Sequence, residues 1–220
     1  AASDVYKRQS DLNAWVGLFA EFAECFGIKA DKNKLFSTLY QKAMEGDKDC
    51  GGMIACNYYS GEPVTGLEEG RPMFLRRPDS HLGLANFMRS HLYASLVTLK
   101  IGLDILLKEE DVKIDSITGH GGLFKTKGVG QSILAAAMNA PISVMETAGE
   151  GGAWGMALLA AYMLFKKDGQ SLGDYLDSRV FAERKSETME PDPADVAGFE
   201  TYTKQYQACL AAEKAAVQAF

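Results

Sequence analysis

The sequence is poor in the residue types that usually mark a catalytic or metal site. It contains 3 histidines and 4 cysteines, and the cysteines are scattered without a CxxC pair or zinc-ligand spacing. No apolar run approaches the roughly 18 residues of a membrane span, and the net charge of −6 leaves no basic surface for a nucleic acid. These absences argue against a metal centre, a disulfide framework, a membrane protein and a nucleic-acid partner. They favour a cytoplasmic protein with reduced thiols.

The composition is that of a folded globular protein. Of the 220 residues, 47% are apolar and 24% are charged, and the length suffices for one substantial core. Residues 1–9 show no hydrophobic periodicity, whereas helical patterning begins abruptly at Ser10. We therefore expect residues 1–9 to be non-native or disordered and a single domain to occupy residues 10–220.

Apolar spacing and turn residues predict the order of the elements. Helices are expected at 10–26, 31–44, 81–108, 131–139, 153–165 and from about 194 to 220. Strands are expected at 53–59, 114–118 and 142–145, and an extended piece at 71–78. Residues 172–189 are polar and irregular, so no regular element is expected there.

One segment carries most of the chemical information, because strand, glycine loop and helix follow one another twice between residues 114 and 157. The glycines of the two loops stand at 119, 121 and 122 and at 149, 151 and 152. A glycine loop that leads from a strand into a helix leaves unpaired backbone N–H groups, and such groups bind phosphate. The segment therefore predicts a nucleotide unit over residues 114–167.

The first loop fits neither of the common phosphate-binding motifs. Counted from Gly119, both GxxxxGK[ST] and GxGxxG need glycine where the chain has Phe124. These glycines could therefore serve only a tight strand-to-helix turn, and His120 could equally donate to a phosphate or orient the loop. The second loop favours a ligand, because the small residues that continue to Ala161 would let the helix backbone lie against the sheet or a nucleotide.

Several motifs in a fixed order resemble a known family. Residues 58–63 read YYSGEP and resemble a YLSGER-P segment, and residues 153–160 read AWGMALLA and resemble ALGAAxLA. The long helix from His81 and the tyrosine-bearing terminal helix also fit. Together these features, from about residue 10 to the end, resemble the C-terminal domain of the FGGY family of carbohydrate kinases.

The resemblance implies both a fold and an activity. The fold is α/β, a helix-rich actin-like ATPase (ribonuclease-H-like) domain that forms the C-terminal half of a two-domain sugar kinase. The activity is ATP-dependent phosphorylation of a carbohydrate hydroxyl, with a pentulose as the sugar, as in xylulokinases and ribulokinases. The implied cofactors are ATP and Mg²⁺, the ion being held mainly through the nucleotide phosphates. The implied partners are ATP or ADP, a sugar bound mainly by the other domain, and a second copy in a homodimer.

The resemblance also implies a set of nucleotide-binding residues. Gly121 and Gly122 would lie against the phosphates. Adenine and ribose would be bordered by Phe124, Lys125 and Thr126, and the other side of the purine would be closed by Glu150, Gly151, Gly152 and Ala153. The cation of Lys125 could approach a phosphate, and the alternative is a solvated lysine at a helix start.

The family's catalytic base is expected upstream of this chain. That base is an aspartate in a Gly-Asp-Gln type motif, followed by a Gly-Thr-Ser type phosphate turn, and neither motif occurs here. We therefore expect no catalytic residue and no metal ligand in the chain, which would be an N-terminally truncated kinase without turnover of its own. Two alternatives stay open: an actin-like ATPase module that couples nucleotide to a protein partner, and a nucleotide-free structural domain of the same fold.

Overall fold

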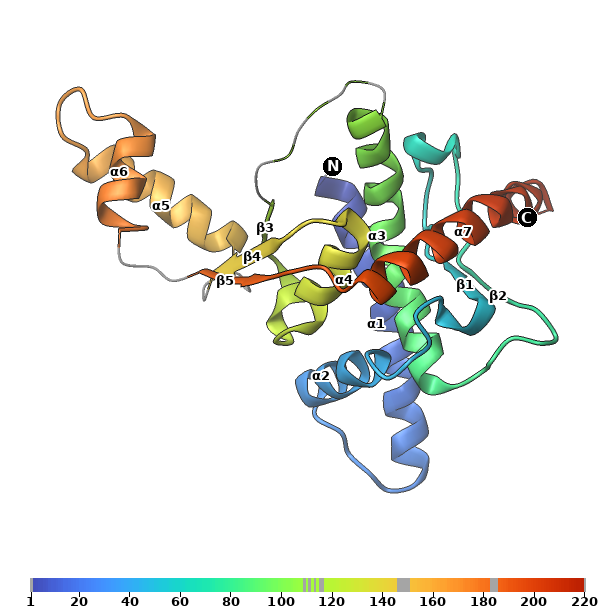
Figure 1. The fold of residues 1–220 in the computed structure, drawn as a ribbon. Helices are drawn as coiled ribbons and strands as arrows, with labels where there is room; N and C mark the ends of the chain where they lie inside the picture. The colour runs from blue at the N-terminus through green and yellow to red at the C-terminus, as the bar shows by residue number, and fades with distance from the viewer. Residues whose placement is uncertain are drawn as a thin grey trace.

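The structure is a computed structural model of the chain. It describes residues 2–108, 117–145, 151–182 and 186–219, together with Glu110, Val112 and Ile114. Helices predominate, and they surround one sheet of two strands and one of three (Figure 1). The helix-rich α/β architecture expected from the sequence is confirmed.

The long helix α3 (Leu84–Lys108) is the central element of the fold. Helices α1 (Ala2–Cys25) and α2 (Lys32–Ala43) pack against it, and the ring of Trp15 in α1 lies 4.9 Å from the ring of Phe87 in α3. By length and composition alone, Leu84–Leu107 could also cross a membrane, but 44% of its apolar window is buried by neighbouring elements. We interpret α3 as a core helix.

The two-stranded sheet and the last helix complete the core around α3. Strands β1 (Met53–Cys56) and β2 (Met73–Arg76) are antiparallel, and every residue of β1 is buried. Helix α7 (Pro193–Ala219) packs on β1 and α3 through three buried aromatic residues, Phe199, Tyr202 and Tyr206. These contacts join the C-terminal helix to the centre of the molecule.

The three-stranded sheet contains the predicted strand–helix–strand unit. Strands β3 (Ile117–Gly119) and β4 (Ile142–Met145) are parallel, and helix α4 (Val129–Met138) connects them. Nearly all of α4 is buried between this sheet, α3 and α7. Because β3 and β4 are parallel, their carboxyl ends, Gly119 and Met145, lie at the same edge of the sheet.

A third strand was not predicted. Residues 172–189 were expected to lack regular structure, but they form helix α6 (Leu172–Arg179) and strand β5 (Ser186–Met189). Ser171 caps α6 by accepting the backbone N–H of Asp174 at 3.1 Å. Strand β5 pairs antiparallel with β4 and has three exposed residues, so its polar sequence reflects an edge strand.

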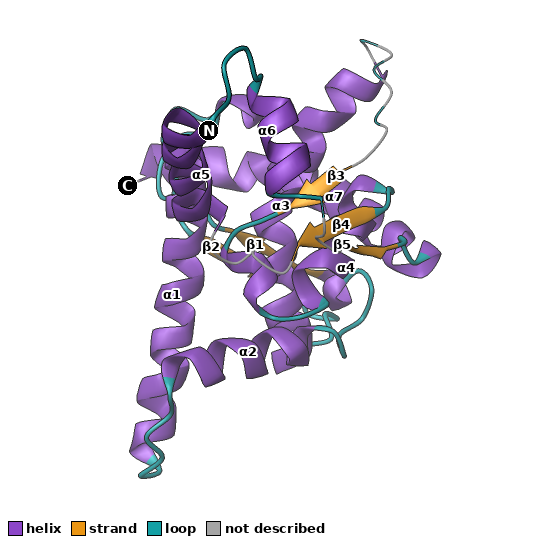
Figure 2. Cartoon of the chain, turned by 90° about the vertical axis from the view of Figure 1, so that its left-hand side faces the viewer, coloured by secondary structure: helices purple, strands orange, loops and turns teal. Residues whose placement is uncertain are grey.

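Helices α5 (Gly151–Phe165) and α6 lie beside each other and to one side of the other elements, at the left of Figure 1. Figure 2 turns this side of the molecule towards the viewer. Tyr162 of α5 contacts Tyr175 of α6 at 5.5 Å between ring centroids, and Trp154 of α5 contacts Phe181, just after α6, at 6.0 Å. The opposite face of α5 is exposed, with Met163 at 76%. The small residues were expected to let α5 lie against the sheet or a ligand. The sheet is not their neighbour, because an added Cβ at Gly155 would meet nothing within 4 Å, and the contact with a ligand stays a prediction.

The first helix begins earlier than the periodicity predicts. Helix α1 starts at Ala2, so residues 2–9 continue the helix that was expected from Ser10. In its central part, Leu12 and Val16 are buried. The second helix agrees with the prediction, because the Asp31 carboxylate accepts the backbone N–H of Lys34 at 2.8 Å and so caps α2.

Candidate nucleotide-binding site

The turn that follows β3 has a backbone that requires glycine at two positions. After Gly119, the chain passes through Gly121 at φ +111°, forms a 3₁₀ turn over Gly122–Lys125, and enters α4 at Gly128 with φ +81°. A side chain at Gly119 is disfavoured for another reason: an added Cβ would lie 2.3 Å from Cζ of Phe124 unless that ring moved. The Phe124 ring therefore lies directly over the end of β3.

One cavity opens at the carboxyl edge of β4, beside the start of α4. Its volume is about 560 Å³, which is within the usual size of a small-molecule site. It is lined by residues from the turn, α4, β4 and β5: Phe124, Thr126, Lys127, Gly128, Gln131, Val144, Met145, Ser186 and Glu187. The wall thus combines an aromatic ring, two apolar side chains and a few polar groups.

A second cavity lies on the other side of the same turn, against α2. Its volume is about 630 Å³, and it is lined by Ser37, Thr38, Leu39, Gln41, Lys42, Glu45, Leu84, Lys125, Thr126 and Lys127. Thr126 and Lys127 line both cavities, so this short segment separates them. Gln41 of α2 donates from Nε2 to the carbonyl of Lys127 at 3.3 Å, which ties the segment to α2.

Three lysines and two glutamates line the cavities on either side of this segment. Lys42 and Lys125 line the second cavity, and Lys127 lines both. Lys42 is paired with Glu45 at 2.5 Å, and Lys127 with Glu187 at 3.3 Å. All four of these paired side chains are at least 42% exposed. Exposed ion pairs contribute little stability, so an anionic ligand could recruit either lysine at small cost.

The structure brings together part of the predicted set of nucleotide-binding residues. Phe124 and Thr126 line the first cavity, and Lys125 and Thr126 line the second. Gly121 and Gly122 precede them at the beginning of the 3₁₀ turn and line neither cavity. His120 is exposed beside this turn.

The residues of the second glycine loop lie differently. Glu150 is outside the described residues. Gly151 begins α5, and Gly152 and Ala153 are in its first turn, where both are exposed and line neither cavity. Their assignment to the far side of a purine therefore remains a prediction from the family resemblance.

Sequence reasoning missed the residues that the tertiary structure brings to the cavities. Gln131 was placed in a helix but given no role, although a glutamine among the apolar residues of α4 is a signal for a buried polar contact. Ser186 and Glu187 were missed because β5 itself was not predicted. Among the described residues, no group of three or more His, Cys, Asp or Glu could hold a metal ion.

Solved structures of sugar kinases have the same fold. A xylulose kinase from Lactobacillus acidophilus superposes with a TM-score of 0.62 at 18% identity, over 89% of this chain and 38% of that one. A gluconate kinase from the same organism gives 0.61 at 18% identity, over 89% and 38%. Plasmodium falciparum glycerol kinase with ADP gives 0.58 at 16% identity, over 90% and 37%.

These likenesses define the class of protein: the fold is that of the actin-like ATPase domain of sugar kinases. The family follows from the sequence match, because residues 5–164 fit the model of the FGGY family of carbohydrate kinases, C-terminal domain. The chain therefore belongs to the FGGY family of carbohydrate kinases. It spans about 38% of the length of the xylulose kinases that it resembles. No curated protein matches the sequence.

Proposed function

We propose that this chain is the ATP-binding part of a kinase that phosphorylates a pentulose hydroxyl. The observation that carries the proposal is the first cavity, which lies at the carboxyl end of β4, beside the start of α4 and against β5. In open α/β sheets, ligands bind outside the carboxyl ends of the strands. Membership of a carbohydrate kinase family makes ATP the ligand to expect there.

The chemistry of the two cavities suits a nucleotide. In the first cavity, Phe124, Val144 and Met145 offer an aromatic and apolar wall for a purine. Cations for the phosphates would come from Lys127, which lines both cavities, and from Lys125, which lines the second. Mg²⁺ would be held through the phosphates and would neutralise their charge. The residues of this chain would bind and orient the nucleotide, while the sugar and its base would be supplied from outside it.

The choice of a pentulose rests on the family motifs, which look closer to those of xylulokinases and ribulokinases than to those of glycerol kinases, and on the likeness to xylulose kinases. The SGE segment at residues 60–62 favours a sugar kinase over an ATPase module. We further propose that the chain alone binds ATP without transferring its phosphoryl group to a sugar. Transfer requires both substrates to be positioned in a site that excludes water.

The proposal is tested by the thermal midpoint of the purified chain with and without millimolar MgADP and MgATP. A ligand present at 100 times its dissociation constant should add about 2.7 kcal/mol to the free energy of unfolding. We expect Lys127→Glu to reduce this effect, because the lysine lines both cavities. The matched control is Lys204→Glu, which makes the same charge change at an exposed position of α7.

The outcomes distinguish the remaining alternatives. No stabilisation by either nucleotide in a cooperatively folded sample would contradict the proposal and favour a nucleotide-free domain. Binding that supports ATP hydrolysis stimulated by a protein, and not by xylulose or ribulose, would favour an ATPase module. Phosphorylation of either sugar by the chain alone would contradict the second part of the proposal.

A further inference from the structure

Gln131 is a buried polar residue whose position requires an explanation. Its side chain belongs to α4, it is only 5% exposed, and it lines the first cavity. Buried amide groups normally satisfy both their donors and their acceptor, because an unsatisfied group loses its hydration without compensation. The hydrogen bonds of Gln131 therefore show which of its atoms is left for a ligand.

Both donors of Gln131 are used by the sheet. Nε2 donates to the carbonyl of Ile142 in β4 at 2.7 Å and to the carbonyl of Glu187 in β5 at 2.7 Å. A carbonyl only accepts, so the amide cannot be reversed without losing both hydrogen bonds. The orientation of the side chain is thus fixed by two backbone groups on neighbouring strands.

The remaining polar atom is the acceptor Oε1. Within the described part of the chain, no hydrogen bond from protein to this atom is present, and the atom is not among the fully buried ones without a partner, so it is accessible on the cavity side. The same wall carries the ring of Phe124 and the side chains of Val144 and Met145, which cannot donate, beside the polar side chains of Thr126, Lys127 and Ser186. Among the described residues, no hydrogen bond joins those polar groups to Oε1, so the wall presents a fixed acceptor beside an aromatic and apolar surface.

A flat heterocycle with an exocyclic N–H donor is the ligand that satisfies this wall. Adenine carries a 6-amino group, which donates, whereas guanine and hypoxanthine carry a 6-oxo group, which only accepts. If a 6-oxo group faced Oε1, two acceptor oxygens would face each other, and neither would have a donor or water as a partner. A site built to hydrogen-bond one group discriminates strongly against an analogue that lacks it.

We propose that Gln131 is the residue that selects adenine over 6-oxopurines, through a hydrogen bond from the 6-amino group to Oε1. The inference rests on the proposed nucleotide function and adds base specificity to it. Its structural basis is the pair of carbonyls on β4 and β5, which prevent the amide from turning to suit a 6-oxo group.

The test compares the affinities of MgADP and MgIDP for the intact chain by titration calorimetry. The two ligands differ in the purine 6-position. We expect ADP to bind at least about tenfold more tightly than IDP. With IDP, one hydrogen bond is lost and the acceptor Oε1 is left unpaired. Equal affinities would overturn the inference while leaving the nucleotide site intact. Binding of neither ligand would overturn both proposals.

Two further measurements isolate Gln131. The variant Gln131→Met keeps the side-chain length but removes the acceptor, so the ADP-to-IDP ratio should fall towards one; a ratio that persists would overturn the assignment. Gln207→Met is the matched control, because Gln207 is an exposed residue of α7 that lines neither cavity, and its ratio should stay at the wild-type value. An experiment without any variant uses ADP methylated twice at the 6-amino group, which has no N–H. It should bind as weakly as IDP, and affinity equal to that of ADP would overturn the inference.

Discussion

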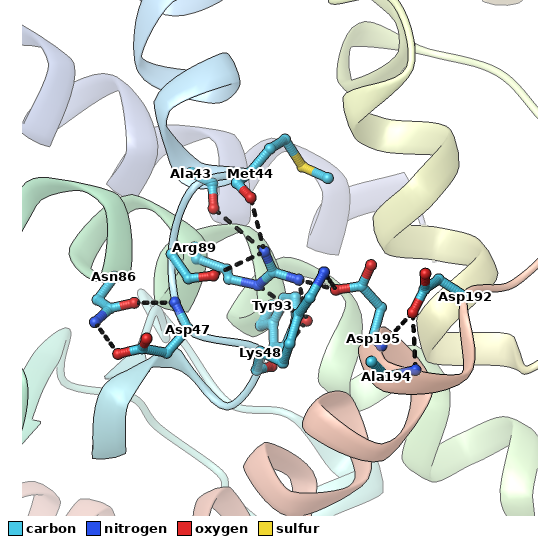
Figure 3. A network of polar contacts seen from close by, with 11 residues as sticks. Ala43, Met44, Asp47, Lys48, Asn86, Arg89, Tyr93, Asp192, Ala194 and Asp195 are labelled. Carbon is cyan, nitrogen blue, oxygen red and sulfur yellow. Dashed lines mark hydrogen bonds and ion pairs between the residues drawn. The ribbon is translucent and has the colours of Figure 1, made fainter.

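The guanidinium of Arg89 in α3 donates to the carboxylate of Asp195 in α7, and both side chains are more than nine-tenths buried. Figure 3 shows the network around this pair. The Tyr93 hydroxyl accepts from Nε of Arg89 at 3.1 Å and donates to the carbonyl of Lys48 at 3.1 Å. Burial raises the pKa of Tyr93 well above its usual range, so the hydroxyl stays neutral. The network joins α3, α7 and the chain that follows α2.

Removing one charge of this pair should destabilise the protein strongly. In Asp195→Ala, the guanidinium of Arg89 would remain buried without its carboxylate. Breaking a buried pair in this way costs about 3–5 kcal/mol. Urea denaturation, followed by far-UV circular dichroism, measures the loss. A weaker effect is expected for Lys48→Met, because Lys48 is the half-exposed second partner of Asp195, at 2.8 Å.

The control for Asp195→Ala is Asp192→Ala. The Asp192 carboxylate accepts the backbone N–H of Ala194 at 2.8 Å and caps α7, so its loss should cost about 1 kcal/mol. Equal losses in the two variants would show that the pair with Arg89 contributes no more than a helix cap.

Two glycines inside helices should respond in opposite ways to alanine. In α7, an added Cβ at Gly198 would lie 2.2 Å from the carbonyl oxygen of Lys48, so Gly198→Ala must displace backbone and should cost about 1–3 kcal/mol. In α1, a Cβ at Gly17 would meet nothing within 4 Å. Gly17→Ala should therefore stabilise the chain by about 0.5–1 kcal/mol through helix propensity. The measurement is the urea midpoint of each variant. Midpoints of Gly198→Ala and Gly17→Ala that shift in the same direction would contradict a close contact between Gly198 and the Lys48 carbonyl.

Elements specified by local signals could be predicted from the sequence. Asp31 caps α2 through a residue three positions away, and the apolar run at 142–145 forms β4. Strand β5 could not be predicted in this way, because Ser186, Glu187 and Thr188 become a strand only by pairing with β4. Tertiary pairing overrides local propensity at such edges.

The same distinction between local and tertiary signals applies to the candidate site. The turn containing Phe124, Lys125 and Thr126 was found from its glycines, which local backbone geometry requires. The contribution of Gln131 depends on carbonyls that lie 11 and 56 residues further along the chain. No local pattern carries that information, and only the pairing of β4 with β5 brings the two acceptors to one side chain.

The contact between Gly119 and Phe124 should couple the stability of β3 to the shape of the first cavity. A methyl group at 119 would overlap the Phe124 ring, so Gly119→Ala should cost about 1–3 kcal/mol. It should also weaken MgADP binding, because Phe124 lines the cavity. In the double variant with Phe124→Ala, the overlap disappears. The loss of stability should then be smaller than the sum of the two single losses by at least about 0.5 kcal/mol.

A double-mutant cycle measured by urea denaturation tests this coupling. The control cycle combines Gly17→Ala with Phe124→Ala, which lie on elements without a shared contact, and it should be additive within about 0.5 kcal/mol. Additivity in both cycles would mean that the Phe124 ring moves away from Gly119 without cost.

The carboxyl group of Glu213 should make the stability of the protein fall as the pH rises. Its side chain is fully buried in α7, where Oε1 accepts the backbone N–H of Arg71 at 2.6 Å. Oε2 has no hydrogen-bond partner among the described residues. Burial raises the pKa of Glu213 above its ordinary value of 4.5, against the opposing effects of that N–H group and of the Arg71 charge.

The raised pKa means that the native state holds this proton more tightly than the unfolded chain does. The free energy of unfolding should therefore decrease as the pH rises above 4.5 and through the native pKa, by up to about 1.4 kcal/mol for each unit between the two pKa values. Glu213→Gln mimics the protonated carboxyl at every pH. The variant should thus gain stability over the wild type as the pH increases from 5 to 8, and the gain should level off above the native pKa.

Urea denaturation at several pH values measures this difference directly. Glu200→Gln is the matched control, because it makes the same substitution at an exposed position of the same helix and should leave the pH profile unchanged. If the Glu213→Gln profile instead ran parallel to that of the wild type, the carboxyl would have the same pKa in both states. The N–H group and the positive charge of Arg71 would then offset the whole effect of burial, and the wild-type carboxylate would be as stable inside α7 as in water.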